Sequence, residues 1–303
     1  MNSKKLRILG LAIGYSVMLG CASPGAKSPY GEANAPKLTP TTQSYRDLVN
    51  LPLPKGKIVA AVYGFRDLTG QYKAAPDSSF STAVTQGAGS MLVKAMLDSK
   101  WFIPVERENV QNLLTERKIE RATAKQQNRA DDLPPLMSAQ ILIEGGIVAY
   151  EADVKTGGAG AKYFGIGASD LYRSDQVTVN LRAVDMQSGR ILDSVTTTKT
   201  ILSMQVDFNV FRFVAFKRLL ELEAGFSSNE PVQMCVNDAI QAALIHLLAR
   251  GIKDSLWALK DPNDINSEIL AAYLNEQSML ENGPAMPANK SSTDKLLTTT
   301  ITH

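Results

Sequence analysis

The chain has 303 residues, of which 44% are hydrophobic, so it is long and apolar enough to bury a sizeable core. Its 32 lysine and arginine residues nearly balance 30 aspartate and glutamate residues, and no basic tract is present, which argues against a nucleic-acid partner. Two cysteines exclude a disulfide framework, and with only His246 and His303 beside them the sequence also argues against a zinc site.

Residues 1–20 predict a secretory signal peptide. Lys4, Lys5 and Arg7 precede an apolar run that is too short for a retained transmembrane helix. The run stops at Cys21, and this pattern resembles bacterial lipoprotein signals, in which the cysteine becomes the acylated N-terminus. That covalent lipid is the only cofactor expected. The alternative is an ordinary cleaved signal followed by an incidental cysteine. Removing the signal leaves 29 basic and 30 acidic side chains.

Hydrophobic periodicity predicts the elements that follow. Residues 21–43 are rich in Pro, Ser, Thr, Gly and Ala and predict a tether between the lipid and the body. Strands are predicted at 57–65, 101–107, 139–154 and 176–202, the last as a hairpin around a QSGR turn. Helices are predicted at 82–98, 109–122 and 231–259.

This order of elements predicts an α+β or α/β domain with a three-layer-like sandwich, built from 44–153, 175–203 and 229–261. Residues 262–303 are polar and are predicted to be a partly disordered extension, without fixed structure beyond Glu281 and without an assigned function. Two inserts, 154–174 and 204–228, do not fit such a body.

The insert at 204–228 predicts a membrane-spanning β-hairpin. Apolar and polar side chains alternate along 204–210 and again along 220–226, with a polar turn expected at 214–218. Membrane strands need ~9–11 tilted residues with apolar side chains toward lipid and polar side chains toward the lumen. The alternative is a half-buried surface hairpin of a soluble domain. The alternation assigns Val206, Phe208, Val210, Leu220, Leu222 and Phe226 to lipid, and Asp207, Glu221 and Glu223 to the lumen.

The insert at 154–174 predicts a second hairpin on weaker grounds. Phe164, Ile166 and Ala168 share one face of an extended chain, and glycines fill the segment TGGAGAKYFGIG. Lys162 is followed by tyrosine, not by serine or threonine, so a phosphate loop and a nucleotide partner are excluded. Two hairpins supply four strands, which cannot close a barrel, and open sheet edges are not tolerated in hydrocarbon. Copies of the chain must therefore share one barrel.

Several segments together carry a family resemblance. They include TGQYK, FSTAVTQ, DSKWFIPVER, NLLTERK, DQVTVNLRAV and SNEPV, within a stretch from TTQSYRDLVNLP to DSLWALK. On these residues the chain resembles the CsgG family of outer-membrane curli secretion-channel lipoproteins. The resemblance implies a homo-oligomeric ring of nine subunits and a barrel of about 36 strands. It also implies unfolded curli subunits, a periplasmic adaptor, surface nucleation accessory proteins and outer-membrane lipids as partners.

The same resemblance implies a constriction inside the barrel. Thirty-six strands about 4.8 Å apart and tilted by about 40° give a barrel with a backbone diameter of about 70 Å. A pore of that width would let periplasmic contents leak out unless a constriction narrowed it. The family narrows it with a loop that carries a Tyr, an Asn and a Phe. Aligned on QYKAAPDSSFS, these positions hold Ala75, Ser79 and Phe80, so Phe80 is expected to form the main apolar ring. The alternative is that Phe80 is a core residue.

The predicted function is a non-enzymatic outer-membrane channel, lipid-anchored with its soluble domain in the periplasm. It would export unfolded curli subunits by diffusion and not by ATP hydrolysis. The alternative is a periplasmic lipoprotein of similar fold, without a pore, that binds and activates an envelope enzyme. No nucleophile, histidine and acid occur in a catalytic arrangement, so no catalytic residue is assigned. His246 and Cys235 are predicted to be core residues.

Overall fold

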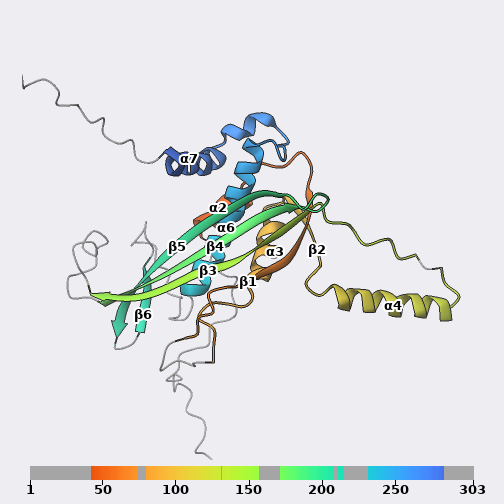
Figure 1. Cartoon of the computed structure of the whole chain (residues 1–303), viewed down its shortest axis with the longest axis horizontal. Coiled ribbons are helices and arrows are strands. Elements are labelled where there is room, and N and C mark those ends of the chain that lie inside the picture. Colours follow the sequence, from red (N-terminus) through yellow and green to blue (C-terminus); the bar gives the residue numbers. More distant parts are fainter. Residues whose placement is uncertain are drawn as a thin grey trace, which may run out of the picture. The chain divides into compact units, whose positions relative to one another are not determined.

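The computed structural model describes residues 42–73, 80–130, 132–156, 171–207, 210–214 and 231–282. These residues contain a mixed six-stranded sheet in the order β2-β1-β3-β4-β5-β6 (Figure 1). β1 is parallel to both β2 and β3, and every other neighbouring pair is antiparallel. The strands are β1 Ile58–Asp67, β2 Phe102–Val105, β3 Ile141–Thr156, β4 Leu171–Asp185, β5 Ile191–Asp207 and β6 Val210–Val214.

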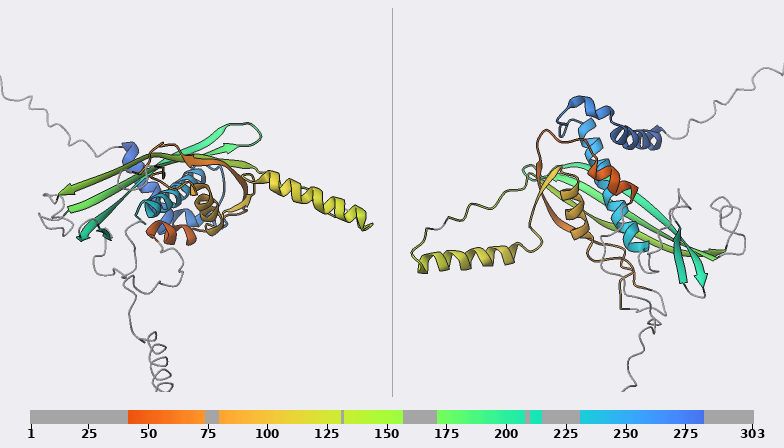
Figure 2. Two further views of the ribbon diagram at one scale, coloured as in Figure 1. Left: turned by 90° about the horizontal axis from the view of Figure 1, so that it is seen from below. Right: turned by 180° about the vertical axis from the view of Figure 1, so that it is seen from behind.

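Helices cover one face of this sheet (Figure 2). α6 packs on β4 and β5, α3 packs on β1 and β2, and α2 and α7 pack on α6. The helices are α2 Gln43–Val49, α3 Ala88–Asp98, α4 Val110–Gln126, α6 Pro231–Lys253 and α7 Glu268–Asn282, with a 3-10 turn η1 at Pro262–Asn266. In the described part of the chain no helix packs on the opposite face, so the three-layer prediction is wrong and the fold is a two-layer α+β arrangement.

The alternation of side chains along β4 explains the two layers. Val177, Val179 and Leu181 are fully buried against the helices. Between them, Thr178 and Asn180 point to the other face and bond to polar side chains of β5. A strand with one apolar and one polar face needs only one covering layer. The strands predicted at 57–65, 101–107, 139–154 and 176–202 are confirmed, including the reversal around QSGR.

α6 supplies the largest part of the core. Its segment Val232–Lys253 is long and apolar enough to cross a membrane, but 67% of the relevant window is buried inside the body. Leu244, Ile245 and Leu247 are fully buried. A helix that is apolar on nearly every side is typical of a core position. α6 is therefore the central helix of the domain.

The helix boundaries differ from those predicted by periodicity. α3 begins at Ala88 and not at 82, and α6 ends at Lys253 and not at 259. Just after α6, Ser255 has φ +60°, and the Leu256 amide bonds back to the Gly251 carbonyl. This left-handed closure ends the helix. Trp257 then folds back over Gly251, where a Cβ would lie 2.0 Å from the indole ring.

Residues 262–282 form η1 and α7, two elements that were not predicted from the sequence. Leu270 of α7 is buried at 1% exposure, and α7 packs on α6. Residues 262–303 are polar when taken together, but they include the apolar run from Ile269 to Leu274. Residues 283–303 lie outside the described part of the chain.

Candidate functional site

The loop after β1 presents Phe80 to solvent. Asp67 Oδ1 accepts hydrogen bonds from the Thr69 amide and hydroxyl, which turns the chain at the end of β1. An antiparallel bridge between Tyr72 and Thr82 then closes the base of the loop. Phe80 lies just inside that base and is 93% exposed. The alternative that Phe80 is a core residue is therefore wrong.

The two other predicted constriction residues, Ala75 and Ser79, lie outside the described residues.

A hydrogen bond ties this loop to the first hairpin. Gln71 Nε2 donates to the Tyr150 carbonyl of β3 at 2.9 Å. Gln71 also accepts at its carbonyl from the Ala83 amide, 2.9 Å away. The two ends of the Phe80 loop are thus joined to each other and to β3.

A buried polar cluster holds β3 and β4 together at the same level. Tyr150 Oη donates to Asp175 Oδ1 at 2.8 Å, and Arg173 Nε donates to the same oxygen at 3.1 Å. Asp175 is 1% exposed, and its carbonyl oxygen lies 3.5 Å from Cys235 Sγ on α6. Burial raises the pKa of Tyr150 to about 12, so its hydroxyl stays a donor. The cluster therefore joins β3, β4 and α6 where the long strands leave the helix-covered part of the sheet.

Replacing Tyr150 with phenylalanine tests this cluster. The variant removes one donor to a buried carboxylate but leaves Arg173 bound to Asp175, so we expect a loss of about 1–3 kcal/mol in the free energy of unfolding. Thermal denaturation of the detergent-extracted protein measures it. Tyr63→Phe, at a tyrosine that is 52% exposed, is the matched control. Equal melting temperatures for the two variants would show that the cluster adds no stability.

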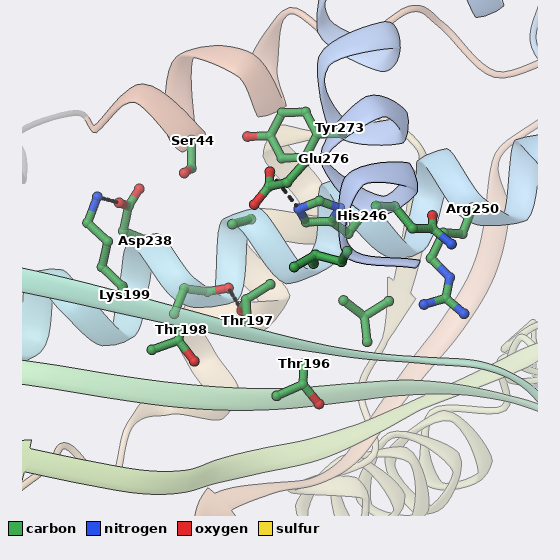
Figure 3. Close-up of a pocket in the computed structure, with 15 residues that line it drawn as sticks. Ser44, Thr196, Thr197, Thr198, Lys199, Asp238, His246, Arg250, Tyr273 and Glu276 are labelled. Atoms are coloured by element: carbon green, nitrogen blue, oxygen red, sulfur yellow. Dashed lines mark hydrogen bonds and ion pairs between the residues drawn. The ribbon is translucent and has the colours of Figure 1, made fainter. Parts of the chain in front are cut away.

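A cavity of about 560 Å³ lies between β5, α6, α7 and the start of α2 (Figure 3). Lys199 of β5 pairs with Asp238 of α6 at 2.5 Å, and His246 Nε2 of α6 lies 3.4 Å from a Glu276 oxygen of α7. Tyr273 stacks edge-on against His246 with ring centres 4.7 Å apart. The sequence did not predict this cavity, because one of its walls is α7 and no helix was predicted there.

A further ion pair at this cavity joins α6 to the start of β5. Arg250 lies 2.7 Å from Asp193, which is 9% exposed. Burial nevertheless raises the pKa of Asp193 above its ordinary value, because desolvation outweighs the attraction of Arg250. His246 is the group at this site whose charge changes nearest neutral pH.

The packing of α7 is expected to weaken in mild acid. Burial lowers the pKa of His246 below its ordinary value of 6.5, although Glu276 opposes the shift. The folded protein therefore binds this proton less well than the unfolded chain does. The resulting stability is complete above pH 6.5 and is lost as the pH falls through the lowered pKa. Melting temperatures at pH 7 and pH 5 should show a larger drop for the natural chain than for His246→Gln, and equal drops would contradict the assignment.

No catalytic or metal site emerges from the part of the chain that the structure describes. Within it, no group of three or more His, Cys, Asp or Glu side chains could hold a metal ion. Cys235 is fully buried, and burial raises the pKa of its thiol to about 12, which keeps it protonated and unreactive.

Comparisons with known proteins identify the family of this chain. Residues 41–277 match the family model described as curli production assembly/transport component CsgG. The chain belongs to the CsgG family. It is 48% identical over 269 residues to the curli production assembly/transport component of Escherichia coli K12, covering 88% of this chain and 96% of the relative. The Salmonella typhimurium relative is 49% identical over 261 residues, covering 85% and 93%.

Two solved structures are similar at lower sequence identity. The PelC dodecamer from Paraburkholderia phytofirmans is 14% identical, with a TM-score of 0.28 over 64% of this chain and 89% of PelC. The hypothetical protein CT253 from Chlamydia trachomatis is 10% identical, with a TM-score of 0.34 over 63% and 96%.

Within this CsgG-family chain, the first predicted hairpin begins and ends inside described strands. β3 runs to Thr156 and β4 begins at Leu171, and these two residues are paired in register. Residues 157–170 lie outside the described residues. The pairing shows that the predicted boundaries at 154 and 174 fall within continuous strands, so the described ends of the insert, 154–156 and 171–174, share one sheet with the body.

The second hairpin differs from its prediction. β5 pairs back on β6 with Asp207 opposite Val210, so the chain reverses between these residues and not at 214–218. The predicted first run through Val210 is therefore wrong. The segment DFNV contains Asp and Asn, which favour turns. The alternation of apolar and polar residues continues through this segment, however, so the sequence pattern does not reveal that the chain reverses there.

The remaining predicted site residues are untested by the structure. For Val206, Asp207 and Val210 only the strand backbone is described. The others lie outside the described residues: Cys21, Phe208, Leu220, Glu221, Leu222, Glu223 and Phe226.

Proposed function

We propose that this chain is a subunit of an outer-membrane channel that exports unfolded curli subunits from the periplasm to the cell surface. The observation that carries the proposal is that two antiparallel strand pairs, the long β3–β4 and the shorter β5–β6, continue the sheet into both predicted inserts. The chain belongs to a family of curli transport components, and both strand pairs extend from the same folded domain. They could therefore enter a membrane side by side. The polypeptide cargo would come from the curli system.

The channel wall would be shared between subunits. Each chain contributes four strands, and a membrane sheet must close on itself because unpaired backbone groups are not tolerated in hydrocarbon. Nine subunits would share the wall, as the family resemblance implies. The acyl chains on Cys21 would hold each subunit at the outer membrane before assembly, with its α+β domain in the periplasm. A periplasmic adaptor and surface nucleation proteins would act at the two mouths.

Phe80 would form the narrowest ring of the channel. The loop base at Tyr72 and Thr82 leaves this side chain exposed, and Gln71 fixes the loop to β3. Ala75 and Ser79 are small, so they would leave Phe80 as the only large apolar group among the three constriction positions. Export would then proceed by diffusion and trapping of folded subunits outside, without nucleotide hydrolysis.

Shortening Phe80 to alanine should raise the single-channel conductance. Removing the phenyl ring from every subunit widens the narrowest part of the pore, and the effect repeats around the ring. Planar-bilayer recording of the purified, acylated oligomer measures it. Ile191→Ala, which truncates another exposed apolar residue (53% exposed), is the control. An unchanged conductance in Phe80→Ala would remove this residue from the constriction.

Electron microscopy of the detergent-extracted, acylated protein tests the proposal itself. The expected particle is a closed ring of subunits with a β-barrel projecting from one side. Single α+β domains without a ring would favour the alternative, a lipoprotein binding module without a pore.

A further inference from the structure

The outer edge of β5 is open beside the cavity of Figure 3. β6 pairs with β5 only from Leu202 onward, so the stretch 191–201 has β4 as its single described neighbour. Five consecutive residues of this stretch, Val195–Lys199, line the cavity. Side chains alternate between the two faces of a strand, so five in a row indicate that the cavity adjoins the strand edge and not one of its faces.

The backbone of this edge is available for pairing. The Ser194 amide donates to the Asp193 side chain and therefore does not bond to β4. In an antiparallel ladder, alternate residues direct their backbone groups to opposite sides. Thr196 and Thr198 consequently direct theirs away from β4, and no backbone partner for them occurs among the described residues. An open edge of this kind is a template for another strand.

The cavity also favours a cationic, donor-bearing occupant. Asp238 is 2% exposed, and its Oδ1 accepts no hydrogen bond from any described residue. The Gln277 side-chain oxygen, also in the cavity wall, is buried and equally unpartnered within the described chain. Around the cavity the three carboxylates of Asp193, Asp238 and Glu276 outnumber the two permanent cations in the ion pairs described above. Both unpartnered atoms are acceptors, so an ammonium group and backbone amides would satisfy them.

We infer that residues 295–302 of the same chain, KLLTTTIT, add a strand to the open edge of β5. Threonine and isoleucine favour strands, and the segment matches the run SVTTTKT at 194–200, where cross-strand threonine pairs are favourable. Lys295, Leu297 and Ile301 share one parity. On the cavity side, Lys295 would reach Asp238 Oδ1, and the two aliphatic side chains would contact the apolar wall of Val195, Ala239, Ala242 and Leu280.

The connection is long enough and begins at the right place. α7 ends at Asn282, and Leu280 in its last turn lines the cavity. Residues 283–294 can span about 40 Å when extended, more than twice the roughly 17 Å length of a five-residue stretch of strand. A short tether also gives an effective concentration in the millimolar range, which favours the chain's own segment over a free peptide. This inference does not depend on the proposed channel function.

Hydrogen exchange followed by mass spectrometry tests the inference on the full acylated protein. With residues 283–303 deleted, the amides of Thr196 and Thr198 are expected to exchange about tenfold faster or more. Thr298→Pro/Thr299→Pro should reproduce this effect because proline removes ladder amides. Ser291→Pro/Ser292→Pro, in the connection, should exchange like the natural chain. Equal exchange in all four proteins would overturn the inference.

Crosslinking decides whether the segment comes from the same chain. Thr198→Cys with Thr298→Cys, treated with a short bismaleimide, is expected to give an internal link that leaves a monomer band in denaturing gels. Cys235 is fully buried and provides an internal unreactive control. A dimer band would assign the edge to a neighbouring subunit, and no link at all would leave the segment elsewhere. Either result would overturn the inference.

Discussion

Gly145→Ala is expected to be among the most destabilising single substitutions in the folded domain. A Cβ at this position would lie 2.0 Å from the Asn180 carbonyl oxygen and 3.1 Å from the Leu181 Cα, and both are backbone atoms of β4. Gly145 also has φ +157°, a conformation that residues with side chains rarely adopt. Next to it, Gly146 is equally confined, because its Cβ would lie 2.5 Å from the Arg66 carbonyl of β1.

Relief of this clash requires β3 and β4 to separate in the middle of their ladder, since no flexible side chain can move away. We expect a loss of about 4 kcal/mol or more in the free energy of unfolding, which corresponds to a melting temperature lowered by roughly 10 °C. Gly64→Ala on β1 is the matched control, because a Cβ there meets nothing within 4 Å. A Gly145→Ala protein that melts with the control would contradict the close approach of the strands.

Leu222→Arg should prevent assembly in the outer membrane. If Leu222 faces lipid near the bilayer midplane, an arginine there costs about 2–4 kcal/mol, and every subunit of the ring carries the same penalty. Because the penalty is repeated around a closed barrel, the heat-resistant oligomer should be lost from outer-membrane fractions. Semi-denaturing gels of heated and unheated samples measure this directly.

Glu223→Gln is the control for this substitution. It changes the charge at a position predicted to face the aqueous lumen, so oligomers should form normally. Normal heat-resistant oligomers in Leu222→Arg would contradict the lipid-facing assignment of that strand. Loss of oligomers in both variants would indicate a general folding defect.

The sheet could be predicted from sequence, because each strand carries its own signal. The run at 58–65 is rich in β-branched and other apolar residues, which predicts a strand, and 176–202 alternates on both sides of a turn that contains Gly189. α6 was also recognisable, because the start signal SSNEP precedes a largely apolar stretch, although its end at Lys253 was not. The left-handed residue after the end of α6 is Ser255. A left-handed conformation can be predicted from a glycine in the sequence but not from a serine.

The site was less predictable because its contacts join distant residues. Tyr150 and Asp175 meet only through the register of β3 and β4, which no local pattern encodes. α7 was not predicted because residues 262–303 together are polar, although Glu268–Asn282 contains the apolar run from Ile269 to Leu274. Leu270 and Tyr273 of this run pack into the core. The exposure of Phe80 likewise depends on the bridge between Tyr72 and Thr82.

Ion conduction by the purified, acylated protein tests the central claim most directly. Added to a planar lipid bilayer, the protein should produce discrete and stable conductance steps, and it should remain with vesicles during a carbonate wash. A protein that washes off as monomers and leaves the bilayer without conductance would show that β3–β4 and β5–β6 do not build a membrane channel.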